Sequence, residues 1–155
     1  MKTNLTLVLI LLFSFYLAKA SAQNSIQSFN VKPENSAAVN KVNLQKAIDW
    51  ASESGAALFV EPSDEPYYID GGIVLKKNVS LIGVHGPTHR GTVHQTKKQP
   101  VGSVFAITDK ENAFITVETA TQIKGIQFWY PEQTLKDPSA IIPYKATIKV
   151  SQTSR

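Results

Sequence analysis

The spacing of apolar residues changes along the chain from a helical pattern to a strand pattern. In the helical segment the apolar positions fall mostly on one face, at intervals of three and four residues: Val42, Leu44, Ala47, Ile48 and Ala51. Asn40 suits the N-cap position, and Gly55 suits the left-handed position that ends a helix. We therefore expect one amphipathic helix over about residues 40–54.

Four short apolar runs follow this helix, as strands separated by turns would. They occupy residues 56–62, 67–69, 73–75 and 79–84. Pro62 closes the first run, and Gly71 and Gly72 separate the second from the third. The pattern predicts four short strands in this part of the chain.

Pairs of apolar residues at positions i and i+2 recur every 21 to 24 residues. The pairs begin at Leu58, Ile82, Phe105, Ile126 and Ile148. Residues two apart lie on one face of a strand, and a period near 22 residues is typical of solenoids. The repeat favours an all-β solenoid. An antiparallel sandwich with similar strand spacing is the alternative.

The first 22 residues have the pattern of a secretory signal peptide. Lys2 precedes an apolar run at residues 5–17, and the small residues that follow permit cleavage after Ala20 or Ala22. A membrane anchor is the alternative, but this run is shorter than the roughly 20 residues of a spanning helix. We expect a secreted, periplasmic or cell-surface protein with no membrane span after cleavage.

Removal of residues 1–22 leaves one expected domain at residues 23–155. Loss of Lys2 and Lys19 lowers the formal net charge from +4 to +2, so the overall charge gives no argument for a nucleic-acid partner and none is expected. The chain has no cysteine. Disulfides and thiolate chemistry are therefore excluded, and stability must come from packing and backbone pairing.

Three segments resemble the N-terminal part of the pectate-lyase superfamily of right-handed parallel β-helices: "LQKAIDWASESGAALFVEP", "YYIDGGIVLKKNVSLIGVHG" and "ENAFITVETATQIKGIQFWYP". More narrowly, the chain is similar to the rhamnogalacturonase and epimerase-like pectate lyase domain, also called glycosyl-hydrolase-28-related, over about residues 28–150. The resemblance implies an all-β solenoid, a right-handed parallel β-helix with an N-terminal capping α-helix over about residues 40–54.

The resemblance also implies action on pectin or a related acidic glycan, by a glycoside hydrolase or a polysaccharide lyase. A non-catalytic glycan-binding or structural module at the cell surface is the alternative. The paired aspartates and Gly-His-Gly of polygalacturonase-like members are missing from the sequence, so no catalytic residue is transferred. No cofactor is expected, and Ca²⁺ would be involved only if the full-length protein is a lyase.

Carboxylates and histidines are the possible reactive groups of this sequence. The densest acidic group, at residues 61–70, surrounds a proline-containing turn and is predicted to be a solvated loop. Glu132 and Asp137 flank a second predicted loop. His85, His89 and His94 lie among glycines and a proline, without a nearby carboxylate or cysteine, so we expect loop histidines and no metal site.

Two groups of residues are predicted to bind an acidic or neutral polysaccharide. Arg90, Lys97 and Lys98 form the most basic loop and could engage uronate carboxylates, with a solvated insertion as the alternative. Trp129 and Tyr130 form the strongest aromatic group. Strand alternation should send Phe128 inward and Trp129 outward, where it could stack on a sugar; burial of Trp129 by the following loop is the alternative.

The chain ends at Arg155, shortly after an apolar strand pattern. A solenoid must cover the exposed side chains and strand edges of its last rung. We therefore expect either an N-terminal portion of a longer protein, inactive by itself, or a partner at this end. Self-association through the same end is one form that such a partner could take.

Overall fold

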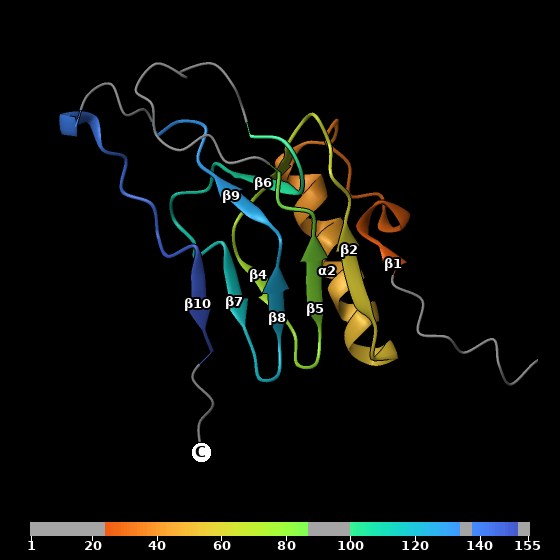
Figure 1. Cartoon of the computed structure of the whole chain (residues 1–155). Helices are drawn as coiled ribbons and strands as arrows, with labels where there is room; N and C mark the ends of the chain where they lie inside the picture. The colour runs from red at the N-terminus through yellow and green to blue at the C-terminus, as the bar shows by residue number, and fades with distance from the viewer. Residues whose placement is uncertain (1–23, 87–99, 134–137, 152–155) are drawn as a thin grey trace, which may run out of the picture.

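The computed structural model describes residues 24–86, 100–133 and 138–151 of the 155-residue chain. These residues form one α-helix, two short 3-10 helices and ten short strands (Figure 1). In chain order the elements are β1 (Asn24–Ser25), η1 (Ile26–Phe29), α2 (Ala37–Ser54), β2 (Ala57–Val60), β3 (Tyr67–Ile69), β4 (Ile73–Leu75), β5 (Ser80–Gly83), β6 (Val104–Ile107), β7 (Ile115–Val117), β8 (Gln122–Lys124), β9 (Gln127–Trp129), η2 (Pro138–Ala140) and β10 (Ile148–Val150).

The predicted helix is confirmed, but its first turn lies earlier than expected. Ser36 is the N-cap, because its side chain accepts a hydrogen bond from the backbone N–H of Val39. Gly55 ends the helix in the left-handed conformation, with φ of 65°, as predicted. Asn40 is not the N-cap: it lies inside the helix and is fully buried.

The four predicted strands are confirmed as β2, β3, β4 and β5. Strands of the described residues assemble into three sheets, in the orders β1-β2-β5-β8, β10-β7-β4 and β3-β6-β9. Every pair of neighbouring strands in these sheets is parallel. From β2 onward, each strand therefore belongs to a different sheet from the strand before it.

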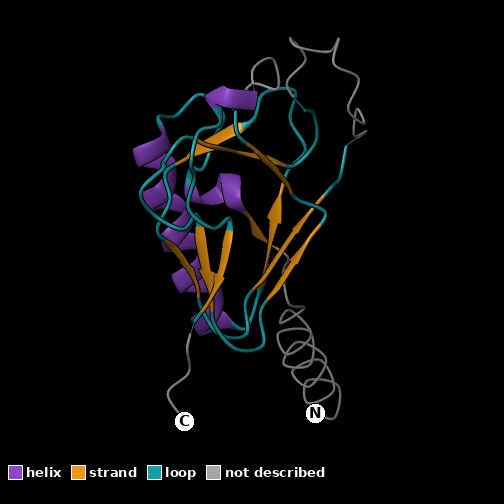
Figure 2. Cartoon of the chain, turned by 90° about the vertical axis from the view of Figure 1, so that its left-hand side faces the viewer, coloured by secondary structure: helices purple, strands orange, loops and turns teal. Residues whose placement is uncertain are grey.

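The predicted fold class is wrong. The sequence predicted an all-β solenoid, a right-handed parallel β-helix, whereas the structure has three separate short parallel sheets and an 18-residue helix. The sheets are set at angles to one another, with the helix along one side (Figure 2). Helix α2 contacts β2, β3 and β4, so the fold is mixed α/β. The antiparallel sandwich is also wrong, because the paired strands are parallel.

The predicted repeat fails because its members are not equivalent positions. The pairs that begin at Leu58 and Ile82 lie in the β1-β2-β5-β8 sheet, whereas the pair at Phe105 lies in the β3-β6-β9 sheet and the pair at Ile148 in the third sheet. Strand pairing also has no constant interval. Leu58 aligns with Leu81, 23 residues later, but Leu81 aligns with Ile123, 42 residues later.

Helix α2 closes one end of the sheets by supplying hydrogen bonds that a neighbouring strand would otherwise make. The Gln45 side chain accepts from the Val74 N–H at 2.9 Å and donates to the Val74 carbonyl at 3.1 Å. Asn40 donates to the carbonyl of Tyr68 at 3.0 Å. These contacts satisfy backbone groups of β4 and β3, and we call this the closed end of the fold.

Candidate functional site

Aromatic side chains stand on the outer face of the β3-β6-β9 sheet. Strand pairing aligns Tyr68 of β3 with Ala106 of β6, and Ala106 with Trp129 of β9. These three residues form one row across the sheet, which we call the outer row. Tyr68 and Trp129 are half-buried, and Ala106 between them is fully buried.

The outer row exists because the neighbouring residue on each strand faces the core. Tyr67, Phe105 and Phe128 are aligned in the adjacent row and pack inside the molecule. Successive side chains of a strand point to opposite faces, so the next residue along each strand faces outward. Two large, half-buried rings therefore lie on either side of the fully buried Ala106, in an arrangement fixed by the sheet rather than by a loop.

The second predicted aromatic residue, Tyr130, lies in a different setting from Trp129. It packs against the core and makes an edge contact with Tyr144, with ring centroids 4.6 Å apart. The hydroxyl groups of Tyr130 and Thr147 are hydrogen-bonded to each other. These contacts fasten the segment before β10 to the end of β9, so Tyr130 positions the backbone beside the outer row.

Charged groups border this tyrosine pair. Lys110 forms an ion pair with Glu132, and both side chains are partly exposed. Burial raises the pKa of the Tyr144 hydroxyl, the Glu132 carboxylate raises it further, and Lys110 partly opposes the effect. These raising effects on the pKa, to which Tyr130 also contributes, favour the neutral phenol.

Some of the predicted site residues can be placed and others cannot. Phe128 points inward as predicted, and Trp129 lies in the outer row, half-buried rather than fully exposed. Arg90, Lys97 and Lys98 lie outside the described residues, as do His89, His94 and Asp137. The binding roles of Trp129, Tyr130 and the three basic residues stay predictions.

His85 is exposed at the end of the described segment that follows β5. Across residues 24–86, 100–133 and 138–151, no three His, Cys, Asp or Glu side chains lie close enough together to hold a metal ion.

Sequence reasoning missed two aromatic residues of this region, Tyr68 and Tyr144. The doublet Tyr67-Tyr68 carried a usable signal, because alternation in a short strand must place one of the two rings outside. Only the strand pairing could show that this ring shares a row with Trp129. Tyr144 lies outside the strands, where no period identifies its partner.

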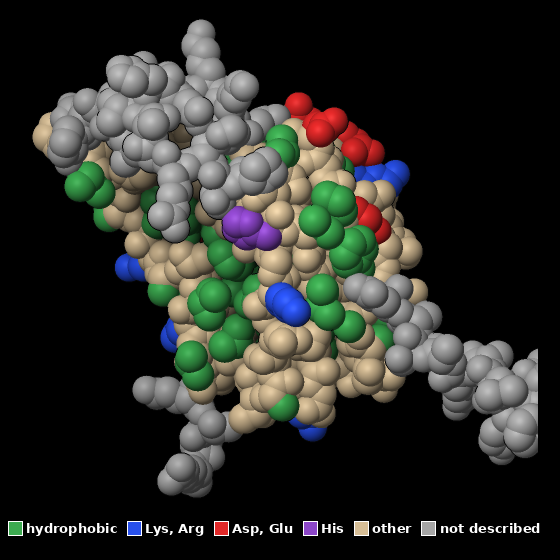
Figure 3. All heavy atoms as spheres, viewed as in Figure 1, with side chains coloured by type: hydrophobic (Ala, Val, Ile, Leu, Met, Phe, Trp, Pro, Cys, Tyr) green, Lys and Arg blue, Asp and Glu red, His purple; other side chains and the backbone are tan. Residues whose placement is uncertain are grey.

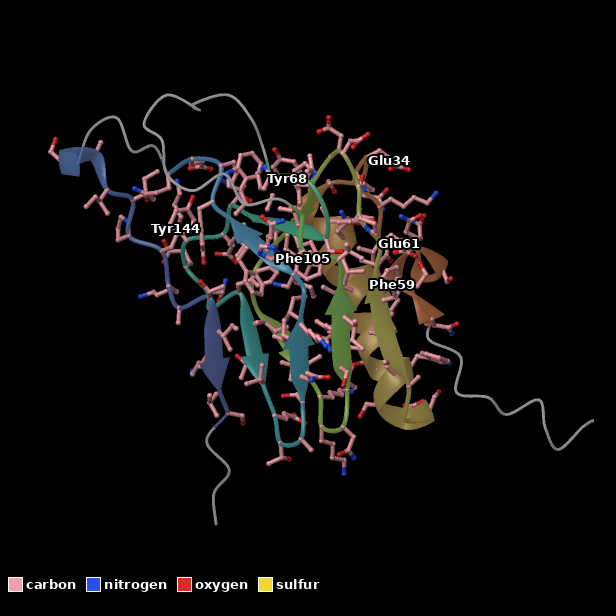
Figure 4. All side chains as sticks on the ribbon, viewed as in Figure 1. Glu34, Phe59, Glu61, Tyr68, Phe105 and Tyr144 are labelled. Atoms are coloured by element: carbon pink, nitrogen blue, oxygen red, sulfur yellow. The ribbon has the colours of Figure 1, made fainter. Side chains whose placement is uncertain are left out.

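Glu61 has a partly buried carboxylate. It directly follows β2, on the other side of the molecule from Tyr144 (Figure 4). Its carboxylate oxygen Oε2 is buried and has no hydrogen-bond partner among the described residues. Burial raises the pKa of Glu61, although hydrogen bonds from the backbone of Glu61 and Gln27 partly lower it. The sequence placed this residue in a solvated loop; the structure has it in the loop after β2, half-buried and with this one oxygen shielded from solvent.

Replacement of Glu61 by glutamine is expected to change how stability depends on pH. The folded state binds the Glu61 proton more tightly than the unfolded state, whose pKa lies near the ordinary 4.5. This contribution to stability is complete below the unfolded pKa and is lost as the pH rises through the folded pKa. The stability of Glu61→Gln relative to wild type should therefore increase as the pH rises from the unfolded pKa, near 4.5, toward the folded pKa, and stay constant above the folded pKa.

Urea unfolding at a series of pH values, from about 4 to about 8, measures this difference. Glu53→Gln, which removes an exposed carboxyl group from the end of α2, is the matched control. A difference between wild type and Glu61→Gln that stays constant across the series would contradict the desolvation of Glu61.

Comparison with protein-family models, curated proteins and solved structures finds no match for this chain. The resemblance to the rhamnogalacturonase and epimerase-like domain therefore stays a prediction from the sequence. Within the part of the chain that the structure describes, no helix has the length and apolar character needed to cross a membrane.

Proposed function

We propose that this chain is an exported polysaccharide-binding protein that holds a glycan against the outer row. The observation that carries the proposal is the alignment of Tyr68 and Trp129 on either side of Ala106. Aromatic faces offer large apolar surfaces suited to the C–H face of a sugar ring. Strands of a sheet are about 4.8 Å apart, so the two aromatic strands are about 10 Å apart. This span suits an oligosaccharide better than a single sugar.

The ligand is an acidic or a neutral polysaccharide. Arg90, Lys97 and Lys98, the basic residues with a predicted binding role, favour an acidic polysaccharide, because guanidinium and ammonium groups pair with uronate carboxylates. Polygalacturonate and rhamnogalacturonan are therefore the first ligands to test, with a neutral glucan for comparison.

We propose binding rather than cleavage as the function of the described residues. Hydrolysis of a glycosidic bond usually needs two carboxyl groups about 5 to 10 Å apart. Glu61 has a raised pKa, but it lies in the loop after β2, a strand of a different sheet from the one that carries the outer row. The outer row itself consists of two aromatic residues and an alanine.

Tryptophan fluorescence provides a direct test, because the chain has only two tryptophans, Trp50 and Trp129. The Trp50→Phe variant leaves Trp129 as the reporter, and its emission should change on addition of the bound polysaccharide. The matched Trp129→Phe variant, which keeps Trp50 on α2, should show no change. Alanine at Tyr68 or Trp129 should weaken binding by about tenfold, since truncating an aromatic anchor of a binding surface commonly costs more than about 1 kcal/mol.

Isothermal titration calorimetry with the same polysaccharides gives the affinities of the wild type and variants. Full affinity in both the Tyr68→Ala and Trp129→Ala proteins would exclude the outer row as the binding surface. Absence of binding to every acidic and neutral polysaccharide tested would contradict the proposed function itself.

A further inference from the structure

Among the described strands, those at the end opposite α2 have no pairing partner on their outer edge. In the described residues, β8, β9 and β10 are the last strands of their sheets, and each pairs with one neighbouring strand. At the closed end, by contrast, side chains of α2 satisfy β3 and β4. We call the β10 edge the open edge.

The inward-facing apolar side chains of the β10-β7-β4 sheet become exposed to solvent at the open edge. Ile73, Ile115 and Ile148 are aligned across the sheet; the first two are fully buried, but Ile148 is 45% exposed. In the next inward row, Leu75 is fully buried and Val150 is 72% exposed. The two side chains of β10 that face the core side therefore lack the covering strand that their equivalents on β7 and β4 have.

The backbone of β10 is also arranged to accept another strand. The Ile115 N–H donates to the Thr147 carbonyl at 3.1 Å, and the Ser151 N–H donates to the Val117 carbonyl at 2.9 Å. Residues of a strand direct their backbone groups alternately to the two sides. Ile148 and Val150, which alternate with the residues bonded to β7, therefore direct their N–H and C=O groups toward the open side.

The charged side chains that the described residues carry on β8, on β10 and in the segment before β10 are lysines. Lys124 on β8, Lys145 before β10 and Lys149 on β10 are all exposed. On the face in Figure 3, lysine and hydrophobic side chains lie over β7, β8 and β10, whereas the acidic side chains seen there lie toward β1 and β2.

Charge disfavours a second copy of this chain as the occupant. Edge-to-edge pairing of two copies would bring their Lys149 side chains, and the neighbouring lysines, onto one sheet. Like charges across paired strands are destabilising, and lysines on an edge strand are a known barrier to such pairing. Head-to-tail pairing of β10 with β4 is blocked, because α2 already occupies the Val74 backbone.

We propose that the open edge binds an extended segment of a partner protein as an additional strand. The segment has apolar residues at alternate positions, which cover Ile148 and Val150, and acidic residues between them, which face Lys149. Main-chain hydrogen bonds would supply affinity, and the alternating side chains would supply specificity. This interaction is independent of glycan binding at the outer row.

Fluorescence anisotropy with the full chain tests the proposal. The probe is a labelled peptide of about nine residues, a usual strand length, that alternates valine and glutamate; its control alternates valine and lysine. We expect saturable binding of the glutamate peptide and at least about tenfold weaker binding of the lysine peptide. The Lys149→Glu variant should reverse this preference.

The Val150→Pro variant tests the backbone contacts, because it removes an N–H that points to the open side and leaves the Ser151 bond to Val117 in place. It should fold as the wild type does and bind the glutamate peptide at least about tenfold more weakly. Equal binding of both peptides would overturn the proposal. A dimer of the wild type would also overturn the proposal if Lys149→Glu raised its stability or left it unchanged. That result would show that a second copy of the chain occupies the open edge.

Discussion

Replacement of Phe105 by alanine is expected to lower the free energy of unfolding by about 3–5 kcal/mol, the usual cost of removing a buried aromatic ring. Phe105 is fully buried on β6. Its ring centroid lies 6.4 Å from Tyr67, 5.8 Å from Phe114 and 6.4 Å from Phe128. Because these neighbours come from separate strands or from the segment before β7, the cavity left by alanine cannot close by moving one side chain.

Urea unfolding of Phe105→Ala and wild type measures this effect, with Phe59→Ala as the matched control. Phe59 lies half-buried on the outward side of β2, so its loss should cost about 1 kcal/mol or less. Both residues are labelled in Figure 4. Similar losses for the two variants would show that the aromatic cluster around Phe105 does not carry the stability assigned to it.

The elements of this fold could be predicted from the sequence because each depends on neighbouring residues. Helix α2 follows from apolar spacing at Leu44 and Ala47 and from the conformational freedom of Gly55. Strands β2 to β5 follow from short apolar runs between turn residues. Such signals extend over a few residues and do not depend on how the elements pack.

The assembly of the strands could not be predicted in the same way. The apolar pairs at Leu58 and Phe105 look alike in sequence, yet they belong to different sheets. A repeat measured from one pair to the next therefore compares strands that never pair. The interval between aligned residues also depends on the connecting loops, as the different spacings of Leu81 from Leu58 and from Ile123 show.

The candidate site was predicted in part for the same reason. Alternation correctly directed Phe128 inward and assigned Trp129 to the opposite face. Tyr68 enters the site through the pairing of β3 with β6 and of β6 with β9, which no local pattern contains. The outer row is formed by three paired strands. The sequence of one strand shows which of its own residues face outward, but not which residues of other strands lie beside them.

Asn40 shows how the same limit applies within the predicted helix. A preference for the N-cap position is a local property of asparagine, and it suggested the wrong role. The side chain instead accepts from the Lys32 N–H at 2.9 Å and donates to the Lys32 carbonyl at 2.8 Å and the Tyr68 carbonyl at 3.0 Å. It joins the chain before the helix to strand β3, which carries the outer row.

Replacement of Asn40 by alanine should therefore lower the free energy of unfolding by about 3–5 kcal/mol, since each buried backbone group left without a partner costs about 1–3 kcal/mol. Asn43→Ala is the matched control: it removes the same side chain from the same helix, but that side chain makes an exposed hydrogen bond to Asn30, and the expected loss is about 1 kcal/mol. Urea unfolding compares the two variants. Equal losses would mean that water replaces Asn40 at the Lys32 and Tyr68 backbones, and that the helix does not hold β3 in place through this residue.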